Sequence, residues 1–393
     1  MRLSDRALNV SPSATLAISR KASQLKAQGV DVVGFGAGEP DFDTPKHIKD
    51  AAAQALAAGD TKYAPKTLAK VQGAVAEDVT RRIGVEYKPS QVLVSCGAKH
   101  SLYNAFQAIT NPGDEVIILS PYWVTYPEQV CMAGGKPVFV ETRGEDDFAP
   151  DIAKVRAALT PSTRAIVINS PSNPCGNVYA REVLDALADI AVENDLIVIS
   201  DEIYDQLLYD GLTHESALTA RPEMKDRTIY VNGASKTYAM TGWRIGWTLA
   251  PKDVTDAMAS IQDHATSNPA SFAVAGAYTA LTGPQECVEE MRRAFEERRT
   301  YMYDRLAAMS CCRISRPRGA FYAMPDFAPV MGRDFGGQVL SDSMDLAGYL
   351  LDKAAVALVP GTPFGAPTYA RLSFATSMET ITKGLDRIEE ALC

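Results

Sequence analysis

Long hydrophobic runs and clusters of positive charge are both missing from this chain of 393 residues. The longest apolar runs, such as VIIL at 116–119, are strand-sized and far short of the roughly 20 residues that span a bilayer. Lys and Arg number 39 against 48 Asp and Glu, so the net charge is −9, and no basic run could neutralise a row of nucleic-acid phosphates. We therefore expect neither a transmembrane segment nor a polyanion partner.

Secretory and disulfide signatures are also missing. The first 24 residues mix acids, bases and single aliphatic residues and lack the continuous apolar core of a secretory signal, which indicates a cytoplasmic protein. The cysteines are odd in number, scattered, and show neither a CxxC pair nor ligand-like spacing with the four histidines. Reduced thiols and no metal site are expected. The seven are Cys96, Cys131, Cys175, Cys287, Cys311, Cys312 and Cys393.

From about residue 92 to 250 the same order of segments recurs: a short run of β-branched residues, a polar turn and a helical stretch. The helical stretches include 101–109 and 181–194, where apolar residues recur every three or four positions. The strand-like runs are 91–95, 115–119, 165–169, 196–200, 228–232 and 244–250. Continuous apolar strands alternating with helices predict an α/β three-layer fold with a mostly parallel sheet that is buried on both faces.

The pattern of predicted helices and strands changes at about residue 286. There a long charged helix over 286–309 leads into an α+β pattern. We predict a further helix near 343–354 and a surface loop at 331–343. The expected organisation is an N-terminal arm with part of a small domain (1–45), a large domain (46–285) and a small C-terminal domain (286–393).

Polar residues follow several of the strands, at the sheet edge where ligands bind in such folds. Asp201 ends the most apolar strand, and either caps a following helix or holds a cation in a cleft. A pyridinium nitrogen is one such cation. Tyr204 would share a helical face with Asp201 if a turn begins there. Asn173 lies in a loop with two prolines, where turn chemistry is the alternative to ligand binding.

Two cations stand in a stretch of small and apolar residues, NGASKTYAMTGWRIGW at 232–247. Apolar surroundings and a second cation both lower the pKa of a lysine, which a nucleophilic Lys236 requires. Arg244 is the candidate for this second cation, and its guanidinium could also donate two hydrogen bonds to phosphate oxygens. Gly97 sits between a strand and a helix start, an arrangement that offers free N–H groups to a phosphate.

Several motifs taken together resemble those of the class I pyridoxal phosphate aminotransferases of the aspartate aminotransferase fold. The similarity runs from about residue 10 to the C-terminus and is strongest to the branch that includes aspartate and prephenate aminotransferases. The motifs are GAGEPDFDTP at 36–45, PYW at 121–123, NPCG at 173–176, DEIY at 201–204, Ser235-Lys236 through Arg244, and RLSFATS at 371–377.

The resemblance implies a pyridoxal phosphate enzyme of fold type I. Lys236 would attach the cofactor covalently and move a proton, Asp201 would hold the pyridine nitrogen, and Trp123 would stack on the ring. Tyr204 and Asn173 would hydrogen-bond the ring's 3-oxygen. The phosphate would be bound by Gly97, Ala98, Ser235, Arg244 and Tyr63, the last from a second subunit of a homodimer.

For the substrate, the resemblance implies that Arg371 pairs with the α-carboxylate, helped by Gly38 and Asn173. Lys99 would face the distal carboxylate of a dicarboxylic substrate, with Ser13 and Thr15 nearby, although an exposed helix lysine is the alternative. Related prephenate enzymes commonly carry a basic residue where this chain has Ser11. Aspartate and 2-oxoglutarate are therefore the preferred substrates, with amino and 2-oxo acids as the only partners besides the second subunit.

One segment departs from the family pattern, with Thr67 in place of glycine and Gln72 in place of arginine. The helical periodicity survives there. The competing functions are a prephenate, aromatic or kynurenine aminotransferase, a carbon–sulfur β-lyase on the same scaffold, and a non-catalytic aminotransferase-like regulator. The regulator would need a DNA-binding module, for which the N-terminal 40 residues show no helix-turn-helix pattern.

Overall fold

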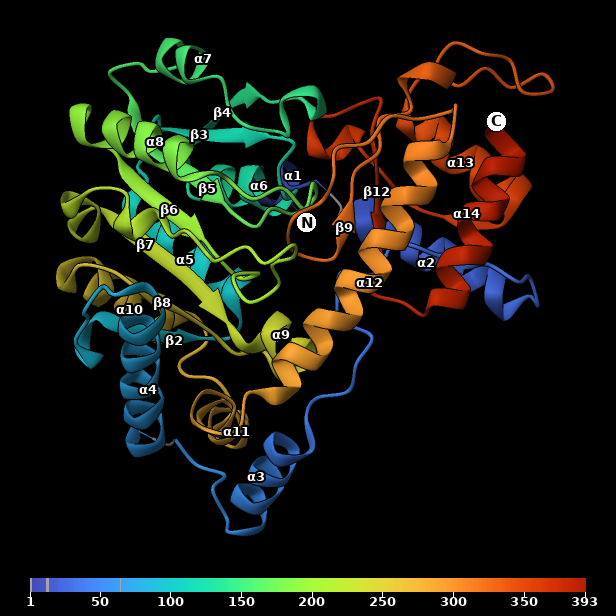
Figure 1. Ribbon diagram of the computed structural model, residues 1–393. Coiled ribbons are helices and arrows are strands. Elements are labelled where there is room, and N and C mark those ends of the chain that lie inside the picture. The colour runs from blue at the N-terminus through green and yellow to red at the C-terminus, as the bar shows by residue number, and fades with distance from the viewer. Residues whose placement is uncertain (1, 12–13, 64) are drawn as a thin grey trace.

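A seven-stranded sheet forms the centre of the larger part of the molecule (Figure 1), seen in a computed structural model that describes residues 2–11, 14–63 and 65–393. Its strand order is β2-β8-β7-β6-β5-β3-β4, and only β8 runs antiparallel to its neighbours. The strands are β2 Val92–Ser95, β3 Glu115–Ser120, β4 Lys136–Glu141, β5 Thr163–Asn169, β6 Ile197–Asp201, β7 Thr228–Gly233 and β8 Gly246–Leu249. The predicted α/β fold with a mostly parallel sheet is confirmed.

Helices cover both faces of this sheet because successive strand residues point to opposite sides. In β3, Val116 and Ile118 pack with α5 and α10, whereas Ile117 packs with α8 on the other face. α4 and α11 cover the end of the sheet at β2, β8 and β7. The helices are α3 Lys46–Ala57, α4 Pro65–Ile83, α5 Ala98–Ile109, α6 Thr125–Met132, α7 Ile152–Ala157, α8 Arg181–Glu193, α9 Ala234–Thr237, α10 Lys252–Ala265 and α11 Ser271–Thr282.

The smaller part is built from segments near both ends of the chain. β1 pairs in parallel with β10, and β9, β11 and β12 form a short antiparallel sheet. α12 runs from the larger part into this region and packs along α14 (Figure 1). The elements of the smaller part are α2 Ala14–Ala27, β1 Val33–Gly34, α12 Glu286–Ala308, β9 Tyr322–Ala323, α13 Ser343–Ala354, β10 Val356–Ala357, β11 Val359–Pro360, β12 Ala370–Ser373 and α14 Met378–Leu392. The short α1 Asp5–Leu8 lies near α6 of the larger part (Figure 1).

The structure differs from the sequence-based expectations at two places. β4 was not predicted, because KPVFVE starts with a lysine and a proline and lies at the sheet edge, where only Val140 is fully buried. The segment after Asp201 forms turns and no helix, so the condition under which Tyr204 would share a helical face with Asp201 is not met. The domain boundaries at 45/46 and 285/286 stay a prediction.

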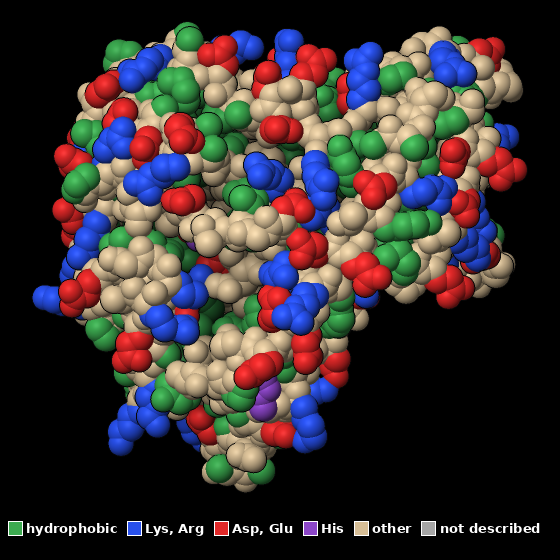
Figure 2. Space-filling view, viewed as in Figure 1, with side chains coloured by type: hydrophobic (Ala, Val, Ile, Leu, Met, Phe, Trp, Pro, Cys, Tyr) green, Lys and Arg blue, Asp and Glu red, His purple; other side chains and the backbone are tan. Residues whose placement is uncertain are grey.

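Among the described residues, the search for a helix that is apolar over a membrane-spanning length finds none. Figure 2 shows Lys and Arg interspersed with Asp and Glu across the face in view, without an extended field of either sign.

Candidate functional site

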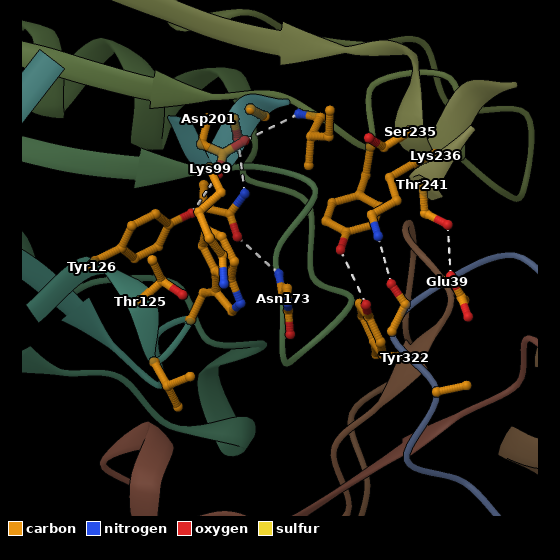
Figure 3. A pocket seen from close by; sticks show the side chains of 18 of the residues that line it. Glu39, Lys99, Thr125, Tyr126, Asn173, Asp201, Ser235, Lys236, Thr241 and Tyr322 are labelled. Carbon is orange, nitrogen blue, oxygen red and sulfur yellow. Dashed lines mark hydrogen bonds between the residues drawn. The ribbon is translucent and has the colours of Figure 1, made fainter. Parts of the chain in front are cut away.

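The carboxyl ends of β5, β6 and β7 open into a cavity of about 500 Å³. The walls come from distant parts of the chain. They are residues 36–39, the start of α5, residues 123–126, the ends of β5 and β6 with the turn after β6, residues from the segment 235–244 that follows β7, and Tyr322 and Arg371 of the smaller part. Figure 3 shows several of these side chains converging on the cavity. Most of the residues singled out from sequence therefore lie in one place.

Asp201 ends β6 and is buried, with 3% of its surface exposed. The Tyr126 hydroxyl donates to its Oδ2 at 2.7 Å, and the Ile203 backbone N–H donates to Oδ1 at 3.3 Å. Burial raises the pKa of Asp201 to about 6, against the lowering effect of these hydrogen bonds. A carboxylate held in this way in a low-dielectric site gains strongly from a cationic partner.

Lys236 lies in α9, directly after β7, and its side chain reaches into the cavity. Its ammonium donates to the backbone carbonyl of Gly38 and lies beside the Tyr204 and Phe321 rings, 5.9 and 5.6 Å from their centroids. Burial lowers the pKa of Lys236 to about 8, with Arg371 and Arg244 adding to the decrease and Glu39 opposing it. At pH 7 roughly a tenth of such an amine is unprotonated, enough for nucleophilic or basic chemistry.

A tyrosine pair stands beside this lysine. The Tyr204 and Tyr322 hydroxyls are 3.1 Å apart, and both side chains are buried. Burial raises the pKa of both phenols, so both are neutral hydrogen-bond donors near pH 7. Tyr322 belongs to β9, so this pair joins the smaller part of the molecule to the turn after β6.

Gly97 and Arg244 are packed against one another at the start of α5. Gly97 has φ +88, and a Cβ at this position would lie 2.5 Å from an Arg244 guanidinium nitrogen. The Arg244 guanidinium also donates to the Thr241 carbonyl at 2.8 Å. Ala98 and Ser235 line the cavity next to this arginine. A helix start without a Cβ, faced by a guanidinium, is suited to an anion such as phosphate.

Arg371 is buried in β12 and held from two sides. Its guanidinium donates to the Asn173 side-chain oxygen at 3.0 Å and to the Gly36 carbonyl at 3.2 Å, and lies 4.4 Å from the Tyr322 ring centroid. Asn173 is in turn fixed by Asn169, whose side-chain oxygen accepts its backbone N–H at 2.9 Å. Within the described part of the chain, the buried Nε of Arg371 makes no hydrogen bond.

Lys99, the second residue of α5, lines the cavity with its ammonium 5.0 Å from the Trp123 ring centroid. Burial and the Arg244 charge lower the pKa of Lys99. Lys99 is therefore a further basic residue of the cavity, besides Lys236, Arg244 and Arg371, and lies close to the aromatic ring that was expected to stack on the cofactor.

Two described residues of the predicted site, Gly97 and Tyr63, are not among the cavity walls, although Gly97 packs against Arg244, which is. Tyr63 is 81% exposed on the surface. Ser13 lies outside the described residues, and so does the side chain of Thr15. The atypical segment forms the start of α4, where the Gln72 side chain donates to the Val92 carbonyl of β2 at 2.8 Å, so the helix is intact.

Sequence reasoning missed four residues that shape the site: Glu39, Tyr126, Thr241 and Tyr322. Glu39 accepts the Thr241 hydroxyl at 2.6 Å and stands beside Lys236 in Figure 3. The GAGEPDFDTP motif contains Glu39 and could have pointed to it. The tyrosines carried no signal, because an aromatic residue among apolar ones is typical of a core.

The residues present fit pyridoxal phosphate. A buried carboxylate suits the pyridine nitrogen, a lysine of lowered pKa suits the aldehyde, and the cradle of Gly97 and Arg244 suits the phosphate. The neutral Tyr204 hydroxyl suits the ring's 3-oxygen.

Comparisons with known proteins agree with this chemistry. The family model described as "Aminotransferase class I and II" matches residues 30–388. An aspartate aminotransferase of Bacillus sp. (strain YM-2) is 46% identical over 98% of each chain, and an aspartate/prephenate aminotransferase of Thermus thermophilus is 47% identical over 99% of this chain and 98% of its own.

Two solved structures show the same fold. The aspartate aminotransferase from Thermus thermophilus with maleate has a TM-score of 0.93 at 46% identity over all of both chains. The aspartate aminotransferase from Rhizobium meliloti has a TM-score of 0.95 at 37% identity, covering all of this chain and 98% of its own.

Proposed function

Because the chain belongs to the class I and II aminotransferases and is a pyridoxal phosphate-dependent enzyme, we propose that it moves an amino group between L-aspartate and 2-oxoglutarate. The observation that carries this proposal is that Lys99 and Arg371 share one cavity with Lys236 and Arg244. Arg371 lies on the Tyr322 ring and Lys99 on the Trp123 ring, and Figure 3 places Tyr322 and Lys99 on different sides of the cavity. Both substrates carry two carboxylates, which such a pair would bind.

When bound, pyridoxal phosphate supplies an electron-withdrawing ring that stabilises negative charge at the substrate Cα. Lys236 would attach the cofactor and, once released, take the proton from Cα with its neutral amine. Asp201, ionised above pH 6, would keep the pyridine nitrogen protonated. Tyr204 and Asn173 would hold the 3-oxygen, and Trp123 would cover the ring face.

Arg371 would bind the substrate α-carboxylate with its guanidinium fork. Its contacts with Asn173 and Gly36 orient the fork before a substrate arrives, which reduces the entropy lost on binding. Lys99 would bind the distal carboxylate, with Ser13 and Thr15 as further contacts. The relative whose structure contains maleate was solved with a dicarboxylate, in agreement with a site for two carboxylates.

The proposal includes a cytoplasmic homodimer in which Tyr63 reaches the phosphate of the partner subunit. The 81% exposed Tyr63 side chain supports this, since tyrosines are enriched in subunit interfaces. The free state of all seven cysteines supports the compartment.

A prephenate or aromatic substrate is the second candidate, because some relatives are named aspartate/prephenate aminotransferases. At Ser11, where a basic residue was expected for prephenate, the backbone N–H donates to the Glu128 carboxylate at 3.0 Å, so this position is in contact with a negative charge. This observation favours aspartate.

The decisive experiment is a panel of amino donors with 2-oxoglutarate, run on the wild type, Lys99→Ala and Lys99→Arg. Loss of a charge-assisted hydrogen bond costs about 1.5–3 kcal/mol, so kcat/KM for aspartate should fall roughly 10- to 150-fold in Lys99→Ala, with partial retention in Lys99→Arg. Aromatic donors should change little. Unchanged aspartate turnover in Lys99→Ala, together with good turnover of aromatic donors, would overturn the substrate assignment.

The same assay tests the non-catalytic alternative. Lys236→Ala is the control without the reactive amine and should show no transfer. If the cofactor-loaded wild type were as inactive as this control towards every donor, the protein would be a regulator and no aminotransferase.

A further inference from the structure

Three cysteine thiols meet where α12 and α14 end in the smaller part of the molecule. Cys311 and Cys312 lie in the turn just after α12, and Cys393 directly follows α14. The thiol of Cys311 lies close enough to the thiols of Cys312 and Cys393 for both to affect its pKa. Against the raising effect of burial, the Ser310 side chain and the Cys311 backbone in turn lower the pKa of the Cys393 thiol, in agreement with this proximity.

The packing of the two helices fixes this meeting. One turn earlier on each helix, Arg305 pairs with Asp386 at 2.7 Å and with Glu389 at 3.0 Å. Cys311 belongs to the same hydrophobic cluster as Ile388 and Leu392 of α14. Figure 1 shows α12 and α14 side by side. The thiol contact therefore results from a long packed interface and not from a chance approach of two loops.

We propose that Cys311 and Cys393 are a redox modification site that forms an internal disulfide with a small-molecule disulfide as the oxidant. The bond would close a ring over residues 311–393, which includes α13, β12 and Arg371.

Exposure determines the order of the two steps. Cys393 is exposed, whereas Cys311 is 0% exposed and cannot meet a reagent itself. The Cys393 thiolate attacks the small disulfide, which forms a mixed disulfide and releases one small thiol. The Cys311 thiolate then attacks the Cys393 sulfur, which forms the internal bond and releases the second small thiol. The two protons lost by the protein thiols end on the two released thiols.

The neighbouring thiol of Cys312 is a poorer partner for Cys311. Disulfides usually join residues whose Cα atoms are 4.4–6.8 Å apart, whereas adjacent residues across a trans peptide are held at about 3.8 Å. The Cys312 sulfur also contacts the Leu306 carbonyl at 3.5 Å. A metal site is the other use for three thiols, but no metal-binding group of three His, Cys, Asp or Glu side chains occurs among the described residues.

The rate should depend on pH in a stated direction. Contact with Cys312 and burial raise the pKa of the Cys311 thiol, and burial raises that of Cys393. Less thiolate is present at neutral pH than in a free cysteine, so disulfide formation should accelerate as the pH rises.

The test treats the reduced, cofactor-loaded enzyme with oxidised glutathione and maps cysteine-containing peptides by mass spectrometry without reduction. The expected product joins the Cys311 and Cys393 peptides and returns to free thiols with dithiothreitol. Cys312→Ser should give the same product. Cys311→Ser should stop at a stable glutathione adduct on Cys393, and Cys393→Ser should leave Cys311 free. A stable adduct on Cys393 of the wild type, a Cys311–Cys312 bond, or no reaction at Cys393 would each overturn the proposal.

Discussion

Two carboxylates with different environments act on the reactive lysine. Glu39 is the charge that most raises the pKa of Lys236, and the buried Asp201 raises it less. Burial outweighs both, so the pKa stays near 8 and below the usual value for lysine. Glu39 is tied to the Thr241 hydroxyl at 2.6 Å, so its position depends on the segment that also holds Arg244. The reactivity of Lys236 is therefore a balance between desolvation and placed charge.

Glu39→Gln should lower the pKa of Lys236 below about 8, because removal of a negative charge disfavours the ammonium form. The rate at which the apoenzyme takes up pyridoxal phosphate should follow the neutral amine, so its midpoint should move to lower pH. Thr241→Val is the matched control, since it removes the hydrogen bond and keeps the carboxylate. An equal shift in both variants would show that Glu39 acts by position, and an unchanged midpoint in Glu39→Gln would contradict the electrostatic role.

Tyr126→Phe should raise the pKa of Asp201 above about 6, because the tyrosine hydroxyl lowers it by donating a hydrogen bond at 2.7 Å. Asp201 favours cofactor binding only when ionised, so the loss of cofactor affinity on acidification should begin at a higher pH in the variant. Spectroscopic titration of pyridoxal phosphate between pH 5 and 8 measures this. Coincident wild-type and variant curves would show that Tyr126 serves packing alone.

The sequence pointed to Lys236, Asp201 and Arg371, because charged residues in apolar or strand-end positions stand out against their neighbours. Tyr126 and Tyr322 did not stand out. An aromatic side chain in an apolar stretch has the same pattern whether its hydroxyl is used or not, and only the tertiary contact to Asp201 or Tyr204 distinguishes the two cases.

At the scale of elements, key residues of the site lie where a strand leads into a helix. β2 leads through Gly97 into α5, and β7 leads directly into α9 with Lys236. β8 runs between β2 and β7 and comes so close to the start of α5 that a Cβ on Gly246 would lie 2.2 Å from the Ala98 nitrogen. Strand β8 therefore fixes the position of the anion site at Gly97 and Arg244 relative to Lys236.

Gly97→Ala should weaken this cradle. The backbone at φ +88 disfavours an L side chain, and the new Cβ would meet the Arg244 guanidinium at 2.5 Å. Strain of about 1–3 kcal/mol predicts roughly 5- to 150-fold weaker binding of pyridoxal phosphate, measured by equilibrium titration. Gly348→Ala in α13 is the control, because its Cβ would meet nothing within 4 Å. It should preserve affinity, and an equal loss in both variants would contradict the cradle argument.

The six strand runs that the sequence predicted all occur, because buried parallel strands need continuous β-branched residues. The antiparallel direction of β8 could not be predicted, since a run of residues carries no sign of its direction. β4 was missed because an edge strand with one buried face needs fewer apolar residues.

At the scale of the whole molecule, one cavity gathers residues from Gly36 to Arg371. The walls from the larger part are the strand ends and helix starts, and the smaller part adds the cation and the tyrosine that close the substrate side. Tyr63 remains outside on the surface of the single chain. The site proposed above is then complete only when a second copy brings its own Tyr63.

Subunit mixing tests this proposal. Tyr63→Ala and Lys236→Ala homodimers should both be impaired, the second completely. A hybrid of the two contains one site with an intact Lys236 and a Tyr63 from the other subunit, so its activity per such site should return towards the wild-type level. Purification of the hybrid by two different tags, followed by an activity assay, measures this. Hybrid activity no higher than that of the Tyr63→Ala dimer would contradict a shared site.

The sequence by itself determined the α/β class, the buried strands and the residue types for cofactor chemistry. Hydrophobic periodicity and charged residues within apolar stretches can both be recognised in short segments of the sequence. Only the tertiary structure decided which hydroxyls reach Asp201 and Tyr204, how Glu39 stands beside Lys236, and that Lys99 and Arg371 share one cavity. These contacts join residues far apart in the chain. They depend on strand order and helix packing, which no single stretch of sequence encodes.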